Sequence, residues 1–224
     1  HLFHTIDYVA KHKNVYVVLN GDLCESATKS SPGAIFDQTV NVQDQRDWTI
    51  EQFKPISKRV LAVTTGNHEE RIYKDVGLDL SKDIASAFGC PYRSSGIMLR
   101  MDLNGIDYWL YMSHGYGGAR TRGGKTVKLE RTATFIHADI YIMSHDHMVN
   151  AEPDIYMAPD EDSLVKGEDG MMSGTMKAHR KMLVKSNAYM KWGGYSESKG
   201  YSPVDMEVPL IKLSGSAKRV RVEI

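Results

Sequence analysis

The chain has 224 residues, of which 42% are hydrophobic and 25% are charged, the balance of an ordinary globular protein. Its 28 basic and 28 acidic residues give a formal net charge of zero, which excludes attachment to nucleic acid or membrane by bulk charge alone. Apolar runs stay well short of the roughly 18 residues of a transmembrane helix, and two cysteines do not suggest a disulfide framework. We therefore expect one cytoplasmic domain over residues 1–224, without a membrane partner.

The first half of the chain alternates helical and extended patterns. Apolar residues at helical spacing predict helices, and continuous apolar runs predict strands that are buried on both faces. In chain order these are a helix over residues 2–10, a strand over 15–19, a loop over 26–33, a helix around 48–53, a strand over 60–63 and a helix over 81–88. Both strands end in polar turns, which are Asn20-Gly21-Asp22 and Thr65-Gly66-Asn67-His68.

The second half of the chain adds antiparallel features. Asn104-Gly105 is the strongest short signal for a hairpin turn, and the flanking runs 97–103 and 106–112 predict its two strands. The remaining expected elements are a helix over about 126–137, a strand over 140–143, a polar excursion or mobile loop over 154–180, and late strands over 182–184, 208–213 and 219–224. These patterns together predict an α/β protein with antiparallel additions.

Polar residues that suit metal coordination collect at the predicted strand ends, where open α/β sheets place ligands. In chain order these residues are Asp22, Asn67, His68, His114, His145 and His147. Any one of them alone is more often a turn or structural residue. Imidazole and carboxylate ligands suit zinc, iron or manganese, and an aspartate that bridges two metals would hold them roughly 3.5–4 Å apart. Taken together, the residues predict a metal site.

Four short motifs follow one another across residues 21–147. They are Gly21-Asp22, Gly66-Asn67-His68-Glu69, Ser113-His114-Gly115 and Ser144-His145-Asp146-His147. In order and spacing they resemble the GD, GNH[DE], H and GHxH blocks of the calcineurin-like metallophosphoesterases, with Ser144 where that family usually has glycine. The resemblance implies a mixed β-sandwich flanked by helices, two divalent metal ions, and hydrolysis of a phosphomonoester or phosphodiester.

The resemblance also implies which residues bind the metals. Asp22 would bridge both ions. Asn67, His114 and His145 would complete the second metal site, and His147 would join Asp22 at the first. Manganese is the expected metal, with iron and zinc as alternatives, because histidine, asparagine and aspartate ligands admit all three.

Catalytic roles follow from the same resemblance. His68 would hydrogen-bond the phosphate and protonate the leaving oxygen, and Glu25 would orient His68 unless it is simply a solvated loop acid. The basic residues Arg120 and Arg122 follow a predicted ligand closely. They either bind further phosphates of a nucleotide or nucleic-acid substrate or belong to a solvated helix start.

One block of the family pattern is missing. The family opens with a D-x-H block on its first strand, and no such block precedes Asp22 in this sequence, which begins at His1 and not at Met. We therefore expect the first strand of the fold to be absent from this sequence.

Two alternatives remain open. Residues 119–126 fit a relaxed phosphate-loop pattern, with Ala119 in place of its first glycine. That interpretation leaves Asn67 and the paired histidines unexplained, and the loop does not follow its strand directly. The other alternative is a binding scaffold of the same fold whose metal site is degenerate.

Overall fold

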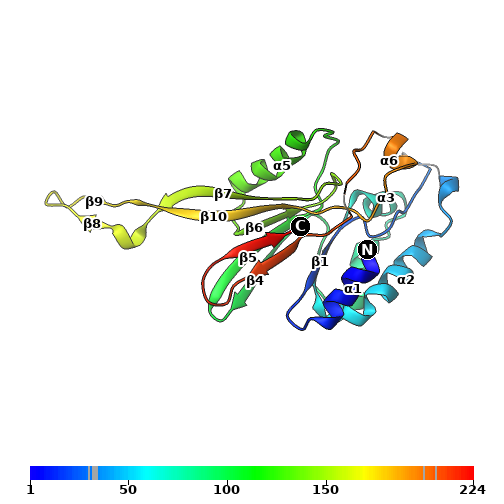
Figure 1. Cartoon of the computed structure of the whole chain (residues 1–224), viewed down its shortest axis with the longest axis horizontal. Coiled ribbons are helices and arrows are strands. Elements are labelled where there is room, and N and C mark those ends of the chain that lie inside the picture. The colour runs from blue at the N-terminus through cyan, green and yellow to red at the C-terminus, as the bar shows by residue number, and fades with distance from the viewer. Residues whose placement is uncertain (30, 32–34, 199, 205) are drawn as a thin grey trace.

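The computed structural model describes residues 1–29, 31, 35–198, 200–204 and 206–224. These residues form four layers: helices, a three-stranded sheet, a five-stranded sheet and a further helix (Figure 1). The two sheets face each other, because one cluster of buried side chains joins Ala62 of the smaller sheet to Met112 of the larger sheet. In the part of the chain that the structure describes, no helix has the length and apolar character needed to cross a membrane.

The smaller sheet is parallel. Its strands lie in the order β1 (Val17–Asn20), β2 (Val60–Thr64) and β3 (Tyr92–Arg93). Successive side chains of a strand point to opposite faces, so Leu19 and Val63 pack on helices while Val18 and Ala62 face the larger sheet. Burial on both faces explains the continuous apolar runs from which the first two strands are predicted.

Helices cover the outer face of the smaller sheet. They are α1 (Leu2–Lys11), α2 (Val42–Phe53), α3 (Asn67–Val76) and α4 (Leu80–Phe88), with 3-10 helices at Ile35–Asp37 and Lys54–Arg59. Asn41 caps α2 and Asp79 caps α4 through side-chain oxygens that accept backbone N–H groups. Gly89, in the left-handed conformation, ends α4 where the sequence predicts.

The larger sheet mixes parallel and antiparallel pairs. Its strands lie in the order β4 (Gly96–Leu103), β5 (Ile106–Ser113), β6 (Ile140–Met143), β10 (Met176–Lys185) and β7 (Asn150–Pro159). The predicted hairpin is confirmed, since β4 and β5 pair antiparallel around Asn104 and Gly105, both with positive φ. Helix α5 (Arg122–Phe135) joins β5 to β6 and packs Leu129 against Tyr141 on the outer face.

Strands β7 and β10 continue beyond the sheet as a long paired arm (Figure 1). The pairing runs from Asn150 opposite Lys185 to Pro159 opposite Met176. The tip carries a 3-10 helix at Glu161–Ser163 and the pair of β8 (Val165–Lys166) with β9 (Met172–Ser173). Residues 154–180 are thus an excursion, as predicted, but one built mostly of strands and not an irregular loop. Backbone pairing orders this segment although its side chains lack a clear apolar pattern.

Other elements differ from the sequence-based prediction in their bounds. Helix α3 starts directly at Asn67, where only a polar turn is predicted, and α5 starts at Arg122 because Thr121 caps it by accepting the N–H of Gly124. The late strands are part of β10, β11 (Leu210–Leu213) and β12 (Val220–Glu223), and a short helix α6 spans Tyr195–Ser198. Residues 30 and 32–34 of the predicted loop over 26–33 lie outside the described residues.

Candidate metal centre

The carboxyl ends of strands from both sheets meet at one place. Asp22 follows β1 of the smaller sheet, and His114 follows β5 of the larger one. Asp22 Oδ2 lies 3.1 Å from His114 Nε2. Asn20, the last residue of β1, ties the sheets together, because its Nδ2 donates to the Ser113 carbonyl at 2.9 Å and to Ser144 Oγ at 3.0 Å. Ser144 therefore accepts a hydrogen bond that links the two sheets.

Asp22, His114 and His145 form a compact group of possible metal ligands. One ligand atom from each lies within 4.8 Å of the others. Asn67 joins the group, since its Oδ1 lies 2.9 Å from His145 Nδ1 and 3.2 Å from His114 Nε2. The structure thus brings together four of the five predicted metal ligands.

When both rings are neutral, the two histidines of the group present unprotonated nitrogens to each other. His114 Nδ1 lies 2.7 Å from the Asn20 carbonyl, and His145 Nε2 lies 2.7 Å from the Gly117 carbonyl. A carbonyl oxygen only accepts, so each of these outer nitrogens carries the proton of the neutral ring. The inner nitrogens then face each other at 3.2 Å with lone pairs. A cation between them satisfies this arrangement, and a backbone carbonyl that orients a ligating histidine is a recurrent feature of metal sites.

The loops of the site have unusual backbone conformations. In the described part of the chain, four of the five non-glycine residues with positive φ lie in these loops, namely Asp22, Ser26, His145 and His147. Such conformations are unfavourable for side-chain-bearing residues and concentrate at functional sites. The first two loops also touch, because a Cβ on Gly66 would lie 2.0 Å from Asp22 Oδ1. Only glycine at position 66 permits this approach.

Glu69 supports the group from behind. Its side chain is buried, with 1% of its surface exposed, and it accepts the backbone N–H groups of Asp22, Cys24 and Gly66 at 2.8–3.0 Å. Burial raises the pKa of Glu69. The sequence contains Glu69 as the last residue of a motif, but its role depends on contacts that the motif does not reveal.

His68 lies at the edge of the group, beside Glu25. Its Nε2 is 3.8 Å from Asp22 Oδ2, and its Nδ1 is 3.4 Å from Glu25 Oε2. Burial lowers the pKa of His68, but the hydrogen bond to Glu25 and the charge of Asp22 outweigh burial and raise it overall. The same hydrogen bond lowers the pKa of Glu25. Glu25 therefore favours the protonated form of His68.

The electrostatics favour an ionised Asp22. Burial alone would raise the pKa of Asp22, but the hydrogen bond from His114 and the charges of His114 and His68 lower it to about 2. The pKa of His114 is raised, because its attraction to Asp22 outweighs the effect of burial. Burial lowers the pKa of His145. The site therefore offers a carboxylate and a neutral imidazole near neutral pH.

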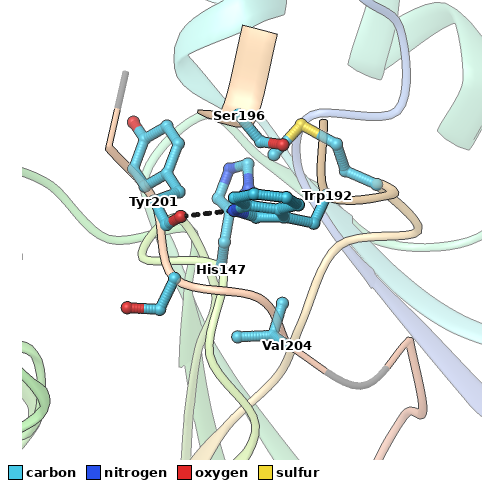
Figure 2. A pocket seen from close by; sticks show the side chains of 7 residues that line it. His147, Trp192, Ser196, Tyr201 and Val204 are labelled. Atoms are coloured by element: carbon cyan, nitrogen blue, oxygen red, sulfur yellow. Dashed lines mark hydrogen bonds between the residues drawn. The ribbon is translucent and has the colours of Figure 1, made fainter. Parts of the chain in front are cut away.

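His147, the fifth predicted ligand, lies outside the compact group. Its ring stacks on Tyr201, with centroids 5.2 Å apart and planes at 5°. Trp192 donates its indole N–H to the Tyr201 carbonyl at 2.9 Å, and Figure 2 shows these side chains around one small pocket. Among the described residues, His147 Nδ1 is buried without a hydrogen-bond partner, and burial lowers the pKa of the ring. An orphaned neutral imidazole nitrogen of this kind fits a metal or another ligand.

Asp146, between the two histidines, is held by two lysines. Its carboxylate accepts from Lys128 Nζ and Lys185 Nζ at 2.6 Å each, and Asp146 and Lys185 have 1% exposed side chains. This ion triad joins the histidine loop to α5 and β10. Sequence reasoning missed it, because the lysines lie far from Asp146 along the chain and only the position of Asp146 between two histidines hints at a role.

Arg120 and Arg122 lie beside a second pocket that also contains Lys125. They are not part of the compact group around Asp22. The phosphate-loop alternative fits this region poorly, because β5 ends at Ser113 and helical backbone already begins at Arg122. A phosphate loop instead follows its strand directly and wraps its backbone around the phosphate.

No protein-family model matches the chain, and no curated protein matches it in sequence. The class of protein must therefore be inferred from the fold and from the geometry of this site.

Proposed function

We propose that this protein is a metal-dependent phosphoesterase of the calcineurin-like class, acting on a phosphomonoester or phosphodiester. The observation that carries the proposal is the geometry of the inner nitrogens of His114 and His145. Both face Asn67 while their outer nitrogens are bound to backbone carbonyls. The layered α/β arrangement and the meeting of four strand ends support the same proposal.

The donor set fits divalent cations of intermediate hardness, and manganese, iron or zinc would suit it. Asp22, Asn67, His114 and His145 would hold one ion. His147, with its orphaned Nδ1, would contribute to a second ion together with Asp22. When bound, two such cations supply charge neutralisation for the phosphoryl oxygens and activate water for attack on phosphorus.

The residues of the chain supply positioning and proton transfer. Glu69 and Gly66 fix the loop that presents Asp22. His68, protonated through Glu25 and Asp22, would donate a hydrogen bond to the phosphate and then its proton to the leaving oxygen. After transfer, the neutral ring of His68 regains its proton from solvent, since a quarter of its side chain is exposed.

Metal stoichiometry and hydrolysis together test the proposal. The protein is reconstituted with manganese, dialysed and analysed by mass spectrometry for metal per chain. Hydrolysis of p-nitrophenyl phosphate and bis-p-nitrophenyl phosphate is followed in parallel. We expect bound manganese and hydrolysis in the wild type, and loss of both in His114→Ala. The exposed His4 on α1 provides the matched control, so His4→Ala should resemble the wild type.

The outcomes separate the alternatives. Two ions per chain with hydrolysis support a dinuclear hydrolase, and one ion with hydrolysis assigns the chemistry to the group around Asp22. Metal binding without hydrolysis of either ester would favour the binding scaffold. Absence of both metal and hydrolysis would overturn the proposal.

A further inference from the structure

Lys125 has a largely buried side chain, of which 5% is exposed. Among the described residues its ammonium group forms no ion pair, unlike the neighbouring Lys128 and Lys185. The charge of Asp146 raises the pKa of Lys125, although burial lowers it overall. That carboxylate already accepts from Lys128 and Lys185 at 2.6 Å each. In the described part of the chain, Lys125 therefore has no carboxylate of its own.

The position of Lys125 at the start of α5 adds to the positive charge around it. Lys125 lies in the first turn of α5, which begins at Arg122, and the first turn of a helix already carries partial positive charge. A buried cation at this end is unfavourable unless an anion accompanies it. Free N–H groups at a helix start are also suited to bind phosphate.

Lys125 lines an open pocket together with Arg120 and Arg122. The pocket has a volume of about 180 Å³, far more than the roughly 10–15 Å³ that a cavity needs to hold one water molecule. The other residues that line it are Met148, Val149, Ser202, Pro203 and Val204. Three cations thus face one cavity that is large enough for a phosphate group.

This basic pocket adjoins the small pocket that contains His147. Ser202 and Val204 also line the small pocket that contains His147 (Figure 2), so the two pockets have lining residues in common. A substrate that reaches the metal centre past His147 would extend into the basic pocket.

We propose that Arg120, Arg122 and Lys125 form a subsite for a second phosphate group of the substrate, next to the phosphate that is hydrolysed. This inference rests on the proposed phosphoesterase function. It narrows the substrate class to compounds with neighbouring phosphates, which are nucleoside polyphosphates or the backbone of a nucleic acid. Guanidinium and ammonium groups recognise such phosphates through charge-assisted hydrogen bonds.

Binding of tripolyphosphate, measured by calorimetry in the presence of a metal chelator, tests the subsite without any catalysis. Lys125→Met keeps the length of the buried side chain and removes its charge. We expect binding to weaken about tenfold or more, because the variant loses a charge-assisted hydrogen bond to the phosphate. Arg131→Gln is the matched control, since Arg131 is exposed further along the same helix. Equal binding by Lys125→Met and the wild type would overturn the subsite.

Arg122→Gln is a second variant that tests the subsite if Lys125→Met does not fold. Arg122 is exposed, so this variant should fold even if Lys125→Met does not, and circular dichroism checks both. We expect weaker tripolyphosphate binding by Arg122→Gln as well. The proposal would be contradicted if folded Arg122→Gln bound tripolyphosphate with wild-type affinity while Lys125→Met either failed to fold or also bound it with wild-type affinity.

Hydrolysis by the manganese-loaded protein distinguishes the two sources of phosphate. KM is compared for oligothymidylate, a nucleoside diphosphate and bis-p-nitrophenyl phosphate, which has a single phosphate. Lys125→Met should raise KM about tenfold more for a substrate with neighbouring phosphates than for the single phosphodiester. A larger rise in KM for oligothymidylate alone would identify nucleic acid as the substrate class. A larger rise in KM for the nucleoside diphosphate alone would identify nucleotides. Equal effects on all three would refute the subsite.

The two proposals can fail separately. If the wild type hydrolyses none of the esters, the phosphoesterase proposal fails, while the calorimetric comparison still decides whether the subsite binds phosphate. If the wild type hydrolyses bis-p-nitrophenyl phosphate but the variants bind tripolyphosphate normally, only the subsite is refuted.

Discussion

Glu69 holds the loop that carries Asp22, since its Oε2 accepts the backbone N–H of Asp22 at 2.9 Å. The same oxygen accepts the N–H of Gly66 at 3.0 Å, and Oε1 accepts that of Cys24 at 2.8 Å. One buried carboxylate therefore connects the loops after β1 and β2. It also closes the first turn of α3, where Glu69 occupies the position typical of a capping box.

Glu69→Gln should destabilise the fold and weaken metal binding. A glutamine amide offers one acceptor oxygen, so its NH₂ group would meet at least one of the backbone donors and leave it unsatisfied. A buried unsatisfied donor costs about 1–3 kcal/mol, and we expect the free energy of unfolding to fall by that amount in urea denaturation. Glu70→Gln is the control, because Glu70 pairs with Lys74 in an exposed ion pair and should lose less than about 1 kcal/mol. Similar losses in the two variants would argue against the supporting role of Glu69.

Asp22→Asn and His68→Asn should have different effects. Asp22 lies at the centre of the ligand group, so its neutral amide should weaken manganese binding. His68 lies at the edge, with Nε2 3.8 Å from Asp22. His68→Asn should keep the metal and lower kcat by about 10²–10⁴-fold, the usual contribution of a general acid. Metal analysis and steady-state kinetics on both variants check this, and equal loss of metal in both would refute the division of roles.

Asp146→Ala should be among the most destabilising single substitutions. It would leave Lys128 and Lys185 close together without their carboxylate. Breaking a buried ion pair by removing one partner costs about 3–5 kcal/mol. Asp154→Ala is a matched control, because Asp154 pairs with Lys181 but is 45% exposed, and Lys181 keeps its hydrogen bond to the Ala133 carbonyl. Urea denaturation should show a much smaller loss for Asp154→Ala, and comparable losses would disprove the importance of the triad.

Tyr92 should make stability depend on pH in alkaline solution. Burial and the hydrogen bond to Asp79 raise the pKa of Tyr92 from its ordinary value of 10.0 to about 12. Since the folded state favours the protonated phenol, the stability that Tyr92 contributes is complete below pH 10 and is lost between pH 10 and 12. The difference in unfolding free energy between the wild type and Tyr92→Phe should therefore shrink from pH 9 to pH 11, a range about the ordinary tyrosine pKa. A constant difference over this range would contradict the expected ionisation.

Short-range patterns predicted most elements of the fold. Continuous apolar runs identified β1, β2 and β6, and the turn Asn104-Gly105 identified the β4–β5 hairpin. Residues 154–180 of the β7–β10 arm were expected as a polar excursion or mobile loop, and their strands were not predicted, because exposed strands that are ordered by backbone pairing leave little side-chain pattern. Helix α3 was missed for a related reason, since it starts with the polar residues of the predicted turn.

The candidate site was predicted where its residues lie within motifs. Asp22, Asn67, His114 and His145 were named from the sequence, and the structure places them together. His147 was assigned to the same centre, but it packs against Tyr201 outside the compact group. In a loop with positive φ, the direction of a side chain depends on its packing. The spacing of residues in the sequence does not predict that direction.

The sequence by itself determined the types of the elements and the chemistry available at the ends of the strands, because both depend on neighbouring residues. Only the tertiary structure decided that Asp22 meets His114 across two sheets, that Asp146 pairs with two lysines, and that Lys125 lines a pocket without an ion pair to any described residue. These relationships join segments far apart in the chain. They arise from the packing of one sheet on the other and of α5 on the larger sheet. Local sequence patterns do not predict that packing.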